Sequence, residues 1–175
     1  GSGKCHVGRE AEQSLTVTNV ATADGFSQNV NASVADNTGK AINNGGTINV
    51  LAAGANDSTS VVAGIDSSSA GAKSGTITVD LISDGAGTSD LGQTSLLSQT
   101  IAVSGDVYRV ADANISPQPV SLANVHINDV AEQTLNVSNQ VAIDGFSESL
   151  IANLGATSGD ATSNSGSFIA LAAGG

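Results

Sequence analysis

A repeat at an offset of 120 residues constrains the fold of this 175-residue chain more than any other sequence feature. Residues 6–55 align without a gap on residues 126–175, and twenty of the fifty positions are identical. The clearest match is Ala11–Asn19 against Ala131–Asn139. A unit of this length is too long for a solenoid repeat of roughly 20–50 residues, so each copy is predicted to be a domain.

The two copies differ in completeness. The first copy continues into residues 56–107, whereas the second copy stops at Gly175. We therefore expect a first domain at residues 1–107 and the first half of a second domain at 108–175. The first copy has Gly1–Cys5 in place of the opening strand that the second copy has at Val120–Ile127, so it is predicted to lack this strand.

Short alternating apolar runs separated by turn residues predict strands and no helices. About seven such runs in 120 residues, with turns every 8–12 residues, are typical of a β-sandwich. Turn pairs such as Asp24-Gly25 and Asp84-Gly85 supply the positive φ angles that turns need. The predicted strands surround Leu15 and Val17, Val30–Val34, Thr47–Leu51, Ser58–Ile65, Ile77–Leu81, Ile101–Val103 and Val120–Ile127, with equivalents in the second copy.

The run Pro117–Asp129, followed by Gln133–Asn139, resembles the start of a choice-of-anchor D repeat, an immunoglobulin-like module related to Hydin-type domains. Ser74–Val79 and Val103–Arg109 extend the resemblance over nearly the whole chain, although Leu122-Ala123 stands where that family commonly has Phe-Gly. The resemblance implies tandem immunoglobulin-like β-sandwiches in bacterial surface or secreted proteins. It also implies a scaffold or adhesin stalk with no catalytic residues to carry over.

Charge and composition exclude several functions. The net charge of −11 repels phosphate backbones and anionic lipid, so nucleic acid is not an expected partner, and no apolar run is long enough for membrane insertion. Two histidines, His6 and His126, lie in different copies, and no nucleophile motif is present. The chain has one Tyr and two Arg, so it is poor in residues that dominate binding sites. We expect a non-enzymatic, extracellular structural protein.

Calcium is the one cofactor that the sequence suggests. Asp84 and Asp90 lie on one glycine-rich segment, and carboxylates are the oxygen ligands that Ca²⁺ takes. The segment lacks EF-hand spacing, and Asp-Gly is first a turn pair. Asp84 and Asp90 are therefore either calcium ligands or residues of an ordinary turn. If they bind calcium, the alternative function is a calcium-stabilised adhesin or ligand-binding module.

Two expectations concern packing and assembly. The half-domain at 108–175 needs a complement, and the apolar side chains of Val120, Leu122, Val125 and Ile127 could pair with an open strand edge of another chain. The predicted partners are copies of this protein or adjacent repeats, assembled head-to-tail into a stalk or filament. The phenylalanines of both Asp-Gly-Phe turns are predicted to plug the sandwich ends.

Overall fold

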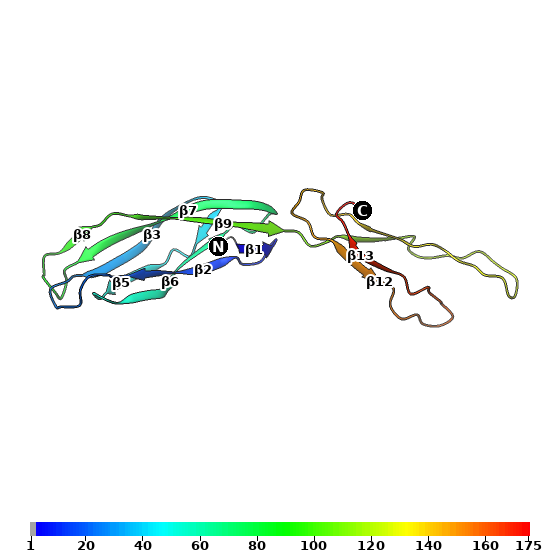
Figure 1. Cartoon of the computed structure of the whole chain (residues 1–175), viewed down its shortest axis with the longest axis horizontal. Helices are drawn as coiled ribbons and strands as arrows, with labels where there is room; N and C mark the ends of the chain where they lie inside the picture. The colour runs from blue at the N-terminus through cyan, green and yellow to red at the C-terminus, as the bar shows by residue number, and fades with distance from the viewer. Residues whose placement is uncertain (1–2) are drawn as a thin grey trace. The chain divides into compact units, whose positions relative to one another are not determined.

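The computed structural model describes residues 3–175, which form strands and turns without a helix (Figure 1). The predicted all-β class is confirmed. The strands are β1 (Gly3–His6), β2 (Glu12–Thr18), β3 (Asn29–Gly39), β4 (Ala41–Asn43), β5 (Thr47–Leu51), β6 (Asn56–Ile65), β7 (Gly71–Asp84), β8 (Gln93–Ser95), β9 (Gln99–Tyr108), β10 (Ala113–Ser116), β11 (Asn136–Asn139), β12 (Leu150–Asn153) and β13 (Ser167–Leu171). Among these described residues, no helix is long and apolar enough to cross a membrane.

The chain divides into two compact units. Unit 1 extends from residue 1 to Val107, and unit 2 extends from Tyr108 to Gly175. The division lies between residues 107 and 108.

Unit 1 is sandwich-like, with two facing sheets. The larger sheet has the order β1-β9-β7-β3-β5, with β8 beside β7, and the smaller sheet has the order β2-β6-β4. In Figure 1, β3, β7 and β9 lie over β2 and β6. Both sheets supply the buried core, which comprises Ala32, Ala41, Ile48, Leu51, Val61, Ala63, Ile77 and Val79.

The core forms because apolar side chains alternate along the central strands. In β7, Ile77 and Val79 are buried, while Thr78 between them is only partly covered. Val61 on β6 faces them from the other sheet and has no exposed surface. Burying an aliphatic side chain of this size contributes about 1.5–3 kcal/mol, so these strands supply much of the stability of unit 1.

The opening of unit 1 differs from the sequence-based expectation. Residues Gly3–His6 align with Ala123–His126, and they form β1 at the edge of the larger sheet beside β9. Unit 1 therefore begins with a short strand. Backbone hydrogen bonding to β9 explains the strand, because this pairing does not depend on side-chain identity.

The predicted strand at Val120–Ile127 is wrong. These residues form no strand, and the chain turns at His126–Asp129, where the Asp129 N–H donates to the His126 carbonyl at 3.0 Å. The counterpart segment in unit 1 is a strand because β9 pairs with it. Residues 108–175 contain no counterpart of β9, so this segment of unit 2 has no strand to pair with.

Unit 2 contains two small antiparallel sheets. β10 pairs with β11, with Ala113 opposite Asn139 and Ser116 opposite Asn136. β12 pairs with β13, with Leu150 opposite Leu171 and a register shift before Ala152. β11, β12 and β13 lie at the repeat positions of β2, β3 and β5, whereas residues 123–126 and 161–163, at the positions of β1 and β4, form no strand.

Candidate assembly surfaces

A buried asparagine organises the same corner in both units. The Asn19 side-chain amide donates to the carbonyls of Gln28 at 3.1 Å and Leu51 at 3.0 Å. Asn139 donates in the same way to Glu148 at 3.0 Å and Leu171 at 3.2 Å. The two side chains are 4% and 0% exposed, which shows that the corner is closed in both units.

The backbone around this asparagine also repeats. The Asn19 N–H donates to the Ala55 carbonyl at 2.9 Å, and the Asn139 N–H donates to the Gly175 carbonyl at 2.8 Å. Val50 and its counterpart Ala170 both have a positive φ, at 58° and 55°. The register shift in the β3–β5 pair recurs in the β12–β13 pair. Unit 2 therefore has the local structure of the first half of unit 1.

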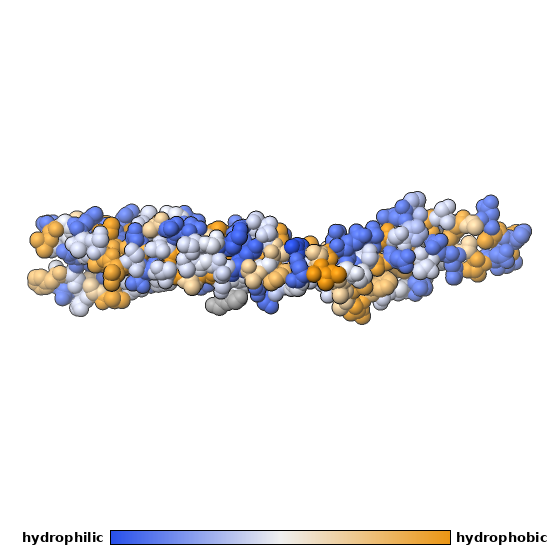
Figure 2. Space-filling model, turned by 90° about the horizontal axis from the view of Figure 1, so that it is seen from above, coloured by the Kyte–Doolittle hydropathy of each residue, from blue (hydrophilic) through white to orange (hydrophobic). Residues whose placement is uncertain are grey.

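The apolar face built on this corner is covered in unit 1 and uncovered in unit 2. Ile48 on β5 is 5% exposed, but its counterpart Phe168 on β13 is 43% exposed. Leu51 is buried, whereas Leu171 is only partly buried. Figure 2 shows hydrophobic residues at the surface of unit 2. The covering side chains of unit 1 come from β6 and β7, which unit 2 does not contain.

The four predicted assembly residues lie on an exposed loop of unit 2. Val120, Leu122, Val125 and Ile127 are 47%, 50%, 51% and 92% exposed. They are accessible, but their backbone is not in a strand conformation. The strands of unit 2 form two two-stranded sheets, so β10, β11, β12 and β13 are all edge strands. β10 was not predicted from the sequence because its four residues carry a single large apolar side chain.

The candidate calcium ligands are engaged in hydrogen bonds. Asp84 is 9% exposed, and its carboxylate accepts from the Ala86 N–H at 3.0 Å, Asn31 at 2.8 Å and Gln93 at 3.0 Å. The Ala86 bond, then those from Gln93 and Asn31, hold the pKa of Asp84 below its usual value. A cation would have to displace these donors, because an N–H group cannot ligate a metal.

Asp90 is exposed, has a φ of 55° and accepts from the Gly87 N–H at 3.4 Å. Among the described residues 3–175, no group of three or more His, Cys, Asp and Glu side chains is arranged to hold a metal ion. The geometry therefore describes a closed turn at the end of β7, and the calcium site stays a prediction.

The two phenylalanines predicted to fill the ends of the sandwiches, Phe26 and Phe146, differ in burial. Phe26 is 90% exposed, so the prediction that it plugs the end of unit 1 is wrong. Phe146 is half-buried against Tyr108, with the ring centroids 5.7 Å apart. The difference arises because Tyr108 packs against Phe146, whereas no aromatic ring among residues 3–175 packs against Phe26.

A groove of unit 1 lies between β1, β2 and β9. Its polar lining consists of Lys4, Cys5, Glu10, Glu12, Gln13 and Ser104, and its apolar lining includes Leu15, Ile65 and Ile101. β2 is an edge strand here, since its one partner among the described residues is β6. The groove thus borders an unpaired strand edge.

Comparison with known protein families found no matching family model, and comparison with curated proteins found no match. The resemblance to choice-of-anchor D repeats therefore depends on the sequence motifs alone.

Proposed function

We propose that this chain is a structural, non-catalytic repeat module of an extracellular bacterial surface protein or filament. Its two units are tandem immunoglobulin-like repeats, and the second is completed by strands that lie outside residues 108–175. The low content of Tyr, Trp and Arg supports a stalk or spacer, because these residues dominate protein-binding hot spots.

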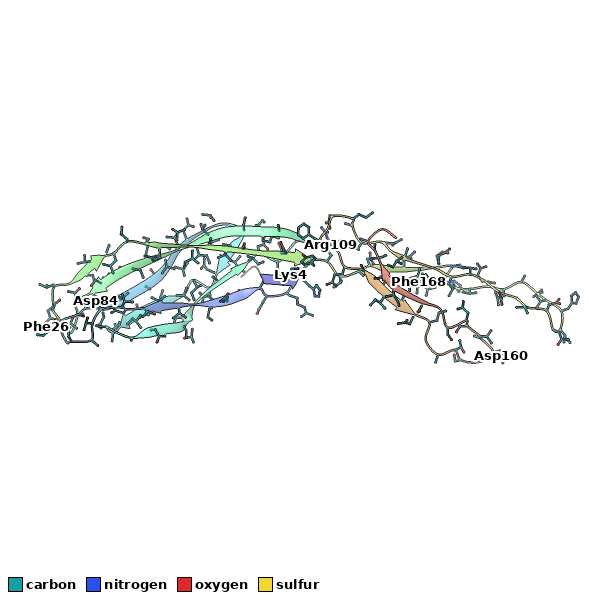
Figure 3. The ribbon with its side chains drawn as sticks, viewed as in Figure 1. Lys4, Phe26, Asp84, Arg109, Asp160 and Phe168 are labelled. Carbon is teal, nitrogen blue, oxygen red and sulfur yellow. The ribbon has the colours of Figure 1, made fainter. Side chains whose placement is uncertain are left out.

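One observation carries this proposal: unit 2 has the closed Asn139 corner of unit 1 but not the strands that cover it. Asn139 is 0% exposed, whereas Phe168 on the neighbouring strand is 43% exposed (Figure 3). Leu171 on the same strand is only partly buried, whereas its counterpart Leu51 is buried. An exposed apolar face of this kind in an otherwise ordered unit is typical of a surface that another element covers.

Unit 2 also retains glycines at two positions where unit 1 brings its backbone close to β6 and β7. In unit 1, a Cβ on Gly39 would lie 2.5 Å from the Ser74 carbonyl oxygen, and a Cβ on Gly46 would lie 2.1 Å from the Ser60 carbonyl oxygen. The repeat counterparts are Gly159 and Gly166, so both close approaches stay open in unit 2.

The counterpart of Asn44 also indicates that a strand like β6 can pack against unit 2. Asn44 donates to the Ser60 carbonyl at 2.9 Å and accepts from the Val62 N–H at 3.0 Å, which joins it to β6. Unit 2 has Asn164 at this position, where it holds the same local bond to the Gly166 N–H at 3.1 Å. A β6-like strand would meet the same acceptor and donor.

Two replacements favour a hairpin from an adjacent repeat over the one in an identical copy. Lys40 pairs with Asp66 at 3.2 Å, but unit 2 has Asp160 in place of the lysine. Asn31 donates to Asp84, but unit 2 has Ile151 there. Against another copy's residues 56–107, unit 2 would place two like charges together and leave a buried carboxylate without one donor, and both are unfavourable.

The test extends the chain by a copy of residues 56–107 directly after Gly175, which keeps the 120-residue register. The copy carries Asp66→Asn and Asp84→Asn, which remove the two mismatches with Asp160 and Ile151. We expect the extension to cover the face of unit 2 and to reduce the fluorescence of the apolar dye ANS. Ala161→Leu should abolish this effect, because its counterpart Ala41 is 2% exposed and packs against Gly75. The matched control is Ala156→Leu, since its counterpart Asp36 is exposed in unit 1.

Equal ANS fluorescence with and without the extension would refute completion by such a hairpin. Light scattering of the original 175-residue chain separates the two sources of the hairpin. A concentration-dependent dimer would show exchange between identical copies, whereas a monomer that binds ANS is the result expected for completion by an adjacent repeat.

A further inference from the structure

The Asp24–Ser27 loop of unit 1 exposes a phenylalanine, and the proposed completion of unit 2 does not explain this exposure. Phe26 in this loop is 90% exposed, an unusual environment for a phenylalanine. Figure 3 shows Phe26 at the end of unit 1. The same Asp-Gly-Phe-Ser sequence recurs at Asp144–Ser147, where unit 2 shows what such a loop binds.

In unit 2, the loop holds the two residues that begin the unit. The Arg109 N–H donates to the Phe146 carbonyl at 2.8 Å, and the Glu148 N–H donates to the Arg109 carbonyl at 3.0 Å. The Arg109 guanidinium pairs with the Asp144 carboxylate. The Tyr108 ring contacts the Phe146 ring with the centroids 5.7 Å apart. Backbone, charge and aromatic contacts thus recognise one tyrosine–arginine pair.

The loop in unit 1 has the same shape without such an occupant. The Asp24 Oδ1 atom accepts from the Phe26 N–H at 2.9 Å and from the Ser27 hydroxyl at 3.3 Å. The equivalent bonds of Asp144 are 3.0 Å and 3.2 Å long. Gly25 has a φ of 80°, close to the 78° of Gly145. The unit 1 loop is therefore preorganised.

The groups that bind Arg109 in unit 2 are available in unit 1. Across the described residues 3–175, the Phe26 carbonyl and the Gln28 N–H take part in no backbone hydrogen bond outside the strands. The Asp24 Oδ2 atom, which corresponds to the oxygen that Arg109 contacts, likewise has no hydrogen-bond donor within this range. A backbone acceptor, a backbone donor and a carboxylate oxygen, none with a hydrogen-bond partner among residues 3–175, thus lie with an exposed aromatic ring on one loop, as they do where Tyr108-Arg109 binds.

We propose that the Asp24–Ser27 loop binds a tyrosine–arginine segment that precedes residue 1, as the Asp144–Ser147 loop binds Tyr108-Arg109 at the start of unit 2. The arginine supplies the charge complementary to Asp24, and the tyrosine covers Phe26. This inference depends on the tandem-repeat part of the proposed function, but it concerns a different surface. The ion pair is exposed in unit 2, with side chains 38% and 35% accessible, so it adds selectivity more than affinity.

The test places a copy of residues 107–120 in front of residue 1 of the full chain. This insertion reproduces the separation of 35 residues between Arg109 and Asp144. Hydrogen exchange measured by NMR then reports the Gln28 amide, which corresponds to the amide of Glu148. We expect its exchange to slow by about tenfold, which corresponds to one added hydrogen bond.

Two variants of the extended chain test the recognition. Replacing the arginine of the extension by alanine should restore fast exchange at Gln28. Asp24→Asn should also restore much of it, while the asparagine keeps the Oδ1 acceptor that shapes the turn. The matched control is Asp36→Asn, an exposed carboxylate elsewhere in unit 1, which should leave the slowed exchange unchanged.

Unchanged exchange at Gln28 in the extended chain would overturn the proposal, and so would slowing that persists without the arginine. Neither result depends on ANS binding by unit 2. Failure of binding at the Asp24–Ser27 loop is therefore distinguishable from failure of the proposed completion of unit 2 by a hairpin.

Discussion

Removal of the Asn19 side chain tests the corner that both units share. In Asn19→Ala, the Gln28 and Leu51 carbonyls lose their donor in a corner where Asn19 is 4% exposed. Each lost hydrogen bond contributes about 1 kcal/mol net, and leaving a buried carbonyl unsatisfied adds a further cost. The variant is therefore expected to lower the free energy of unfolding of unit 1 by about 2–4 kcal/mol.

The assay must report unit 1 alone. Native-state hydrogen exchange at the amides of Val61 and Ile77 meets this requirement, because both residues lie in the core of unit 1 and are fully buried. A loss of this size also corresponds to a fall in melting temperature of about 4 °C or more per kcal/mol.

Two controls define the refutation. Asn139→Ala removes the equivalent bonds of unit 2 and should leave exchange at Val61 unchanged. Asn49→Ala changes an exposed asparagine of unit 1 and should cost less than about 0.5 kcal/mol. A loss below about 1 kcal/mol in Asn19→Ala would show that the buried amide does not hold the corner.

Three further predictions concern packing, pH and calcium. Ile77→Ala should destabilise unit 1 by about 2–5 kcal/mol in urea unfolding, because its side chain is fully buried, whereas Ile169→Ala at an 83% exposed position of unit 2 should cost less than about 0.5 kcal/mol. The pKa of Asp84 is lowered from 3.8 in the folded chain, so its stabilising contribution is complete above that value and is lost as the pH falls through the folded pKa. Acid unfolding of Asp84→Asn should therefore show a weaker dependence on pH below about 4 than the parent chain. Millimolar calcium should leave the melting temperature unchanged in calorimetry, and a rise that Asp90→Asn abolishes would instead establish the calcium site.

The alternating runs determined most of the strands. Leu15 and Val17, and Ile77 and Val79, lie in β2 and β7 because alternation places one side of each strand in a core. Gly25 and Gly145 of the Asp-Gly pairs have the positive φ that the turns were predicted to need, at 80° and 78°, whereas Gly85 does not. These features depend on neighbours in sequence, so the sequence alone revealed them.

The candidate sites were less predictable. Asp84 has the residue type of a calcium ligand, but only the fold brings Asn31 and Gln93 to its carboxylate. Val120–Ile127 has a strand-like pattern, but the structure gives it no strand to pair with. Strand formation requires a partner from elsewhere in the chain, so the pattern of a single segment does not decide it.

The sequence by itself determined that this protein is an all-β chain built on a 120-residue repeat, because alternation and self-similarity are local properties. Only the tertiary structure decided which copies of a residue are buried. Phe26 and Phe146 have the same neighbours in sequence, yet Phe26 is 90% exposed while Phe146 is covered by Tyr108. Burial depends on what packs against a residue in space, and identical segments acquire different surroundings when their partners differ.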